Sequence, residues 1–288
     1  MKIFSSAGKD FYSARACGLD KEKTNLFHSL ASVHYSEGKK LYEQKDFMNS
    51  YKELSNSILL DSNSNAFFLR SKIFIERNKP NPDSAEADLS AIIRHAPDSA
   101  MAETYYRRGM QREAKSDFIY AADDYRKELL IYAASDASYI KDVYKRKANS
   151  EIKLKKYFAA AQDFESAGKK FKDDFCYQLS AEQYFATDSF NKAIDVTSAA
   201  EKLSTRRPEI FCLRGRAYFM NGDIKKAKGD FENAVLLDKN NADAEYWIGR
   251  VMLKNDKFED AVNPLYLGTF SKVFVGDAYY YLGYAKIK

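Results

Sequence analysis

Hydrophobic positions along the chain follow the period of amphipathic helices, and residues 208–241 show the pattern clearly. Phe211, Gly215 and Tyr218 are spaced by four and three residues, so they share one helical face. The segment 221–223, Asn-Gly-Asp, interrupts this pattern with a turn signal. The helical spacing then resumes in a second set of small and apolar residues, which comprises Ile224, Ala227, Phe231, Ala234 and Val235. The segment therefore predicts two helices joined by a tight turn.

The two-helix pattern returns along most of the chain at intervals of 33 to 39 residues. One position of the first helix, here termed the anchor, is usually small. Small residues are expected where two helices cross closely, because they leave room for a large side chain of the facing helix. The aligned anchor residues are Gly38, Lys72, Gly109, Ala148, Ala181, Gly215, Gly249 and Gly283. The repetition predicts a stacked array of helix pairs.

The repeating unit resembles the tetratricopeptide repeat, a helix–turn–helix of about 34 residues with the motif W-x2-L-G-x2-Y, followed by A-x3-F, A and P. Residues 208–241 depart from it at Arg214, in place of leucine, and at Lys239, in place of proline. The resemblance covers about residues 27–288 and implies an all-α, right-handed superhelical solenoid of antiparallel helix pairs. The motif positions of this unit are filled by Phe211, Arg214, Gly215, Tyr218, Gly222, Ala227, Phe231, Ala234 and Lys239.

The array is expected to divide into three parts. Residues 27–271 form about seven helix pairs, and residues 1–26 precede them with a candidate lone helix that packs on the first pair. Residues 272–288 are a terminal helix or the start of an eighth repeat. The Asn/Pro-rich loop at 78–83 is longer than the usual turn, and Pro264 is expected to kink or shorten its helix.

Composition narrows the class of protein. Of the 288 residues, 45% are hydrophobic and 30% are charged, which excludes collagen-like and disordered chains. The start of the chain lacks the apolar run of a secretory signal, and no uncharged apolar stretch is long enough for a membrane span. Three cysteines make no disulfide framework, so a cytoplasmic protein is expected, with a periplasmic location as the alternative. The net charge of +5 does not by itself require nucleic acid.

Motifs that carry chemistry are missing from the sequence. It contains no H-E-x-x-H, C-x-x-C, G-x-x-x-x-G-K-[ST] or G-x-S-x-G. Cys176 and Cys212 are expected to be buried structural thiols, and His34 a packing residue. We therefore predict no catalytic site, no metal, no cofactor and no enzymatic activity.

The resemblance implies that the first helices line a concave groove. With the anchor counted as position eight, positions two, five, nine and twelve would face it, next to position six. These positions mix Tyr, Phe and Arg, which are residue types enriched in binding hot spots. The alternative is that these side chains pack against the next repeat or cover apolar surface. Acids at position two are interpreted as helix N-terminal residues rather than as a site for a basic ligand. The candidate partner-binding residues are Tyr106, Arg107, Lys145, Arg146, Arg216, Tyr246, Trp247 and Arg250.

These features predict a protein–protein interaction scaffold or adaptor that binds an extended or helical segment of a partner whose identity is unknown. The carboxylate clamp of chaperone cofactors in this family is not assembled, since only Asn149 fits it. Three alternatives stay open. The chain could be the interaction module of a larger multidomain protein or of a secretion or assembly complex, or a nucleic-acid-binding repeat that uses basic runs such as 145–147 and 225–228. Membrane insertion is not expected, and self-association through the Tyr-rich segment 273–288 is a further alternative.

Overall fold

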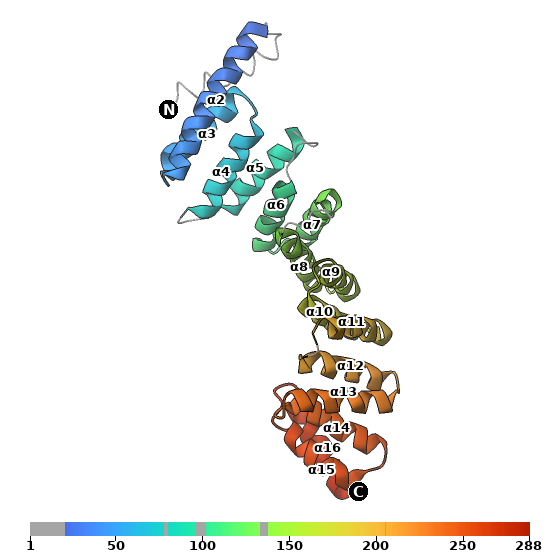
Figure 1. Ribbon diagram of the computed structural model, residues 1–288. Coiled ribbons are helices and arrows are strands. Elements are labelled where there is room, and N and C mark those ends of the chain that lie inside the picture. Colours follow the sequence, from blue (N-terminus) through green and yellow to red (C-terminus); the bar gives the residue numbers. More distant parts are fainter. Residues whose placement is uncertain (1–20, 78–79, 96–101, 133–137, 205) are drawn as a thin grey trace. The chain divides into compact units, whose positions relative to one another are not determined.

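The computed structural model describes residues 21–288, apart from residues 78–79, 96–101, 133–137 and 205. These described residues form fifteen helices and no strand (Figure 1), which confirms the all-α repeat array. Residues 1–20, with the candidate lone helix, lie outside them. The helices follow one another as seven pairs and a last single helix: α2 (Lys21–Glu43) with α3 (Phe47–Leu60), α4 (Ser64–Glu76) with α5 (Pro82–His95), α6 (Ala102–Ala114) with α7 (Phe118–Tyr132), α8 (Ser138–Lys153) with α9 (Tyr157–Phe171), α10 (Asp174–Phe185) with α11 (Phe190–Leu203), α12 (Pro208–Met220) with α13 (Ile224–Leu237), α14 (Ala242–Lys254) with α15 (Phe258–Gly268), and α16 (Val275–Ile287).

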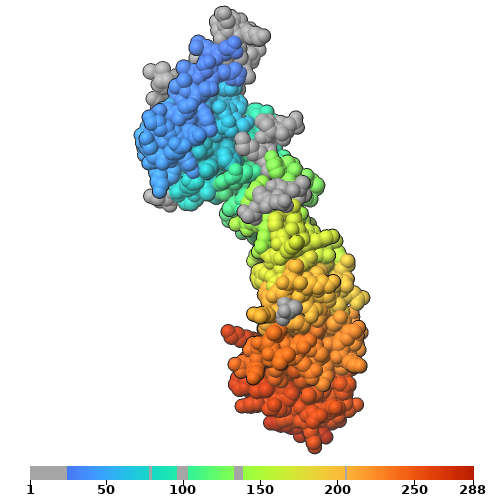
Figure 2. Space-filling model, viewed as in Figure 1, coloured from blue at the N-terminus to red at the C-terminus, as the bar shows by residue number. Residues whose placement is uncertain are grey.

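The chain divides into two compact units, Met1–Asp136 and Ala137–Lys288. The described helices of the first unit are α2–α7, and those of the second are α8–α16. In the second unit, each helix packs against the next one along the chain, and the colours from yellow-green to red follow one another in Figure 2. Each repeat therefore contacts mainly its neighbours in sequence, as expected for a solenoid.

The anchors are small because a large side chain of the second helix occupies the space beside them. A Cβ atom added to Gly109 would lie 2.6 Å from the ring of Tyr125, and one added to Gly215 would lie 2.7 Å from the ring of Phe231. Both rings are fully buried. The steric reason predicted from the sequence is confirmed at these anchors.

The anchor of the second repeat is Ser71, so the alignment of Lys72 was wrong by one residue. Ser71 is fully buried, whereas Lys72 is half-buried with its Nζ atom 5.3 Å from the centre of the Tyr42 ring. The stretch of chain from Ser71 to Ala85 is longer than the equivalent stretch from Gly109 to Ala121. The extra residues therefore lie in the connection of α4 and α5, where the longer loop was predicted.

In six of the seven pairs, a described residue of the turn lies in the left-handed region, seven positions after the anchor. Gly222 has a φ of 83°, and five non-glycine residues at the same turn position adopt this region. The following N–H closes the helix by reaching back five residues, as Asp223 does to the carbonyl of Tyr218 at 2.9 Å. The non-glycine residues at this position are Lys45, Ser116, Lys155, Asp188 and Asp256, with φ values between 54° and 62°.

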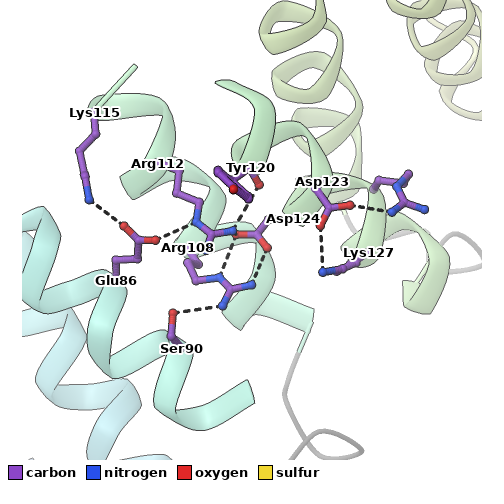
Figure 3. Close-up of polar contacts among 10 residues, drawn as sticks. Glu86, Ser90, Arg108, Arg112, Lys115, Tyr120, Asp123, Asp124 and Lys127 are labelled. Atoms are coloured by element: carbon purple, nitrogen blue, oxygen red, sulfur yellow. Dashed lines mark hydrogen bonds and ion pairs between the residues drawn. The ribbon is translucent and has the colours of Figure 1, made fainter. Parts of the chain in front are cut away.

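A buried ion pair joins the two helices of four repeats and explains why Arg214 replaces the leucine of the motif. The cation precedes the anchor, and an aspartate three residues after the second small position accepts from it. In Figure 3, Asp124 of α7 accepts from Arg108 at 2.7 Å and from Arg112 at 2.8 Å, both on α6. Arg112 also reaches Glu86 on α5 at 2.8 Å, which ties two repeats together. The four pairs are Arg70–Asp88, Arg108–Asp124, Lys147–Asp163 and Arg214–Asp230.

The helix α15 continues through Pro264 and has 11 residues, the fewest of any described helix. This agrees with the predicted shortening. Among the described residues, no helix is both long enough and apolar enough to cross a membrane.

Candidate partner-binding surface

The eight predicted residues lie on four first helices. Tyr106 and Arg107 belong to α6 in the first unit. In the second unit, the structure brings the residues of α12 and α14 into one cluster. The α8 residues contact other side chains. The residues of the second unit are Lys145 and Arg146 on α8, Arg216 on α12, and Tyr246, Trp247 and Arg250 on α14.

Two arginines of the cluster lie over aromatic rings. The Cζ atom of Arg216 is 4.4 Å from the centre of the Phe185 ring and 5.5 Å from that of Phe274. The Cζ atom of Arg250 is 3.9 Å from the centre of the Tyr281 ring. Such cation–π contacts contribute roughly 0.5–2 kcal/mol each. They hold both guanidinium groups in fixed positions on the first-helix side of α12 and α14.

Tyr246 and Trp247 are core residues. Tyr246 is 1% exposed and stacks on Phe274 at 4.8 Å between ring centres, and Trp247 is 7% exposed. Of the two alternatives stated for the groove aromatics, packing against the next repeat describes these two side chains. Substituting Tyr246 would therefore disturb the core as well as any surface near it.

A pocket of about 180 Å³ opens next to this cluster. Three successive first helices, α10, α12 and α14, supply its walls, together with Phe274 from the connection before α16. The predicted groove positions meet here, because residues at positions two, five and nine line the same space. These are Glu209 and Asp243 at position two, Gln178 and Cys212 at position five, and Glu182 and Arg216 at position nine.

Two N–H donors at the pocket have no acceptor among the described residues. They are Nε of Arg216 and Nε1 of Trp247, and both atoms are buried. A buried donor without an acceptor costs about 1–3 kcal/mol. An oxygen acceptor on a bound ligand would remove this cost.

The charge around the pocket is mainly negative. Glu182, Glu209 and Asp243 line it against a single cation, Arg216. Burial lowers the pKa of the Arg216 guanidinium below its usual value, and Asp243 and Glu182 act against that shift. Burial also raises the pKa of the Cys212 thiol to about 12, and the negative charges of Asp243 and Glu209 add to this increase. The pKa of the Cys212 thiol is therefore raised both by burial and by the carboxylates around the pocket.

The remaining predicted residues are held by contacts of their own. Lys145 lies 5.6 Å from the centre of the Phe175 ring. Arg146 donates to Asp142 at 2.7 Å, and Arg107 donates to Glu103 at 2.8 Å. Tyr106 packs near Tyr125, with ring centres 6.3 Å apart. Arg107 and Arg146 thus pair with carboxylates of their own helices, so fewer of their N–H donors are available to a partner.

Sequence reasoning missed several residues of the pocket. Gln178 and Glu182 occupy predicted groove positions, but their chemistry singled neither of them out. Phe274 lies in a connection outside the repeat alignment, so the sequence pattern carries no signal for it. Among the described residues, no group of three or more His, Cys, Asp or Glu side chains could hold a metal ion.

The buried thiols lead to a prediction on reactivity. Cys176 and Cys212 are free and buried, as expected, and burial raises the pKa of Cys176 to about 11. Because a raised pKa keeps the thiol protonated at pH 8, both should react with dithiobis(nitrobenzoate) about a hundredfold more slowly in the native protein than in urea. The measurement uses a C17S background, which removes the third thiol. A native thiol that reacts at the rate of the unfolded chain would contradict the expectation.

Comparison with known proteins agrees with this architecture. Residues 208–241 match the family model described as tetratricopeptide repeat. Among solved structures, the C-terminal part of a TPR repeat-containing protein from Cytophaga hutchinsonii is 14% identical with a TM-score of 0.59, and the match covers 86% of this chain and 99% of that chain. The MamA protein is 17% identical with a TM-score of 0.50, and the match covers 61% of this chain and 94% of that chain. At these identities the structural matches show the fold alone, and no curated protein matches the sequence. Residues 208–241 are therefore similar to the tetratricopeptide repeat, and the described helix pairs have the fold of a tetratricopeptide-repeat array.

Proposed function

We propose that the chain is a non-catalytic protein–protein interaction scaffold that binds an extended or helical segment of a partner on the first helices of its second unit. One observation carries the proposal. Three successive first helices place equivalent repeat positions around a single pocket, and two buried N–H donors there lack an acceptor among the described residues. A peptide offers backbone oxygens that could fill this role, and its side chains could contact the surrounding aromatic and charged groups.

A catalytic role has little support at this site. The only thiol that lines the pocket, Cys212, has a raised pKa, whereas a nucleophilic cysteine needs a lowered one. Tetratricopeptide-repeat proteins are generally non-catalytic scaffolds, and the pocket contains neither histidine nor serine.

The contacts of the basic runs weaken the nucleic-acid alternative. Lys147 is held by Asp163 at 2.5 Å and by Glu151 at 2.9 Å. Lys226 pairs with Asp223 at 2.8 Å, and Lys228 pairs with Glu232 at 3.0 Å. These cations are already neutralised locally, so they would gain less from phosphate than free surface lysines would.

Three further expectations stay proposals. Free, buried Cys176 and Cys212 favour a cytoplasmic location. Exposed Tyr279 and Tyr280 on α16 favour self-association through that helix. The interaction unit could also serve a larger multidomain protein or a secretion or assembly complex.

The proposal predicts that filling the mouth of the pocket abolishes partner capture. In the double variant E182W/E209W, two indole rings would occupy the space that a partner segment needs. In pull-downs from lysate of the source organism, we expect a protein that wild type retains and this variant loses. The control variant E232W adds the same ring to the exposed surface of α13 and should capture normally. Equal recovery by all three proteins, with unchanged thermal unfolding, would place the interface elsewhere.

A further inference from the structure

The pocket between α10, α12 and α14 combines two features that together specify the chemistry of its ligand. Two of its lining residues, Arg216 and Trp247, each have a buried N–H that lacks an acceptor among the described residues, and three carboxylates line the same pocket. The inference drawn from this combination rests on the proposed function of the same surface, because it names the class of partner segment that the surface accepts.

The donors come from two helices. Nε of Arg216 on α12 and Nε1 of Trp247 on α14 are both buried and lack an acceptor among the described residues. The Trp247 side chain is more than nine-tenths buried, and indole can only donate. The group that completes this site must therefore carry an oxygen acceptor.

The carboxylates decide which oxygen fits. Glu182, Glu209 and Asp243 line the pocket, and Arg216 is the only cation among the lining residues. Outside the lining, Arg207 lies 3.8 Å from Glu209 and offsets part of its charge. The Ser271 hydroxyl donates a hydrogen bond to Asp243, but it does not neutralise the charge of that carboxylate. The balance stays negative, so a free carboxylate or phosphate would be repelled, whereas a neutral carbonyl oxygen would not.

The same carboxylates attract a cation. Glu209 is about half exposed, so a positively charged side chain can reach it from solvent. Gln178 donates to Glu182 at 3.1 Å and holds that carboxylate at the pocket without neutralising it. Because packed helices lie about 8–10 Å apart, a ligand that touches both α10 and α14 has to extend across α12.

We propose that the pocket takes a basic, extended peptide segment. A backbone carbonyl of the segment accepts from the N–H groups of Arg216 and Trp247. A lysine or arginine beside that carbonyl lies against the carboxylates of Glu182, Glu209 and Asp243. The acids at repeat position two, which the sequence alone explained as helix N-terminal residues, would then also select the partner.

The test is a selection from a random dodecapeptide library displayed on phage, at near-physiological salt, against the full chain. The enriched peptides should contain more lysine and arginine than the starting library. The tightest peptide is then synthesised with both ends blocked, so that no terminal charge takes part, and its affinity is measured by fluorescence anisotropy. In the variant E182Q/E209Q, this affinity should fall by about tenfold. Replacing the basic residues of the peptide by norleucine should lower the affinity by a similar factor and remove the effect of the variant.

Two further variants complete the design. W247F keeps a ring but removes the indole N–H, and it should lower the affinity for the selected peptide by about fivefold. E232Q on α13 removes a carboxylate outside the pocket and should leave the affinity unchanged. Thermal unfolding of each variant shows that the array remains folded.

The other outcomes separate the failure of the inference from that of the proposed function. Enrichment of acidic peptides whose binding is lost in R216Q would keep the binding surface but overturn the basic ligand. Basic peptides that bind E182Q/E209Q as tightly as wild type would overturn the inference by placing their site elsewhere. Failure to enrich any peptide would count against both the inference and the proposed binding surface.

Discussion

Replacing Asp124 by alanine is expected to lower the free energy of unfolding of the first unit by about 3–5 kcal/mol. The carboxylate is fully buried and accepts from Arg108 and Arg112, whose side chains are 9% and 14% exposed. Removing it leaves the Arg108 guanidinium facing the hydroxyl of Ser90 on α5 (Figure 3), which carries no charge, so a buried cation loses its counterion. Hydrogen exchange of α6 and α7 and urea unfolding of the full chain would measure the loss.

The neighbouring residue supplies the control. Asp123 pairs with Arg126 at 2.6 Å and with Lys127 at 2.9 Å on the same helix, and these side chains are largely exposed. Such pairs contribute only about 0.2–1 kcal/mol, so D123A should have a small effect. If D124A were no more destabilising than D123A, the buried pairs would not be holding the repeat together.

Replacing Gly249 by alanine should destabilise the second unit by about 1–3 kcal/mol, because the added methyl group overpacks the crossing of α14 and α15. A Cβ atom there would lie 2.5 Å from Cγ of Leu265 and 3.2 Å from the Leu265 backbone nitrogen. Leu265 is fully buried and cannot retreat without moving its helix. Thermal and urea unfolding of the full chain would measure the change.

Gly283 offers a matched comparison at the same repeat position. It lies on α16, and a Cβ atom added there would meet no other described atom within 4 Å. The variant G283A should therefore gain up to about 1 kcal/mol from the higher helix propensity of alanine. Opposite signs for the two substitutions are the expected result. Destabilisation by both would contradict the expectation that the close crossing at Gly249 sets the cost, because Gly283 has no such crossing.

The sequence predicted the parts of the fold that depend on period. Small residues such as Gly109 and Gly215 mark helix crossings because their neighbours are large, and the spacing of these residues shows the repeat. The misaligned Lys72 shows the limit of this approach, since an insertion in the following loop shifts the register without a change in pattern. Fixed repeat lengths cannot detect such a shift, and only the burial of Ser71 revealed it.

The candidate surface was predictable in outline but not in detail. Repeat position assigned Arg216 to the groove side of its first helix, because position depends on the helical period, and Arg216 lines the pocket in the structure. The burial of Tyr246 could not be predicted from the sequence. It depends on stacking with Phe274, and Phe274 lies in a connection that has no periodic pattern. The buried Arg–Asp pairs were also missed. A charged residue in a repeat suggests a solvated face unless its partner on the following helix is considered with it.

The left-handed turn residues are positions at which single substitutions can raise the stability of the array. Five of the six described turns have Lys, Ser or Asp in the left-handed conformation, which glycine adopts more easily. Each of these residues costs roughly 1 kcal/mol of stability. Each turn is local to one repeat, so substitution by glycine at one turn should not disturb the others. A chain built this way holds a reserve of simple stabilising substitutions. The proposed binding surface could therefore change in sequence while single substitutions at the turns restore the stability that is lost.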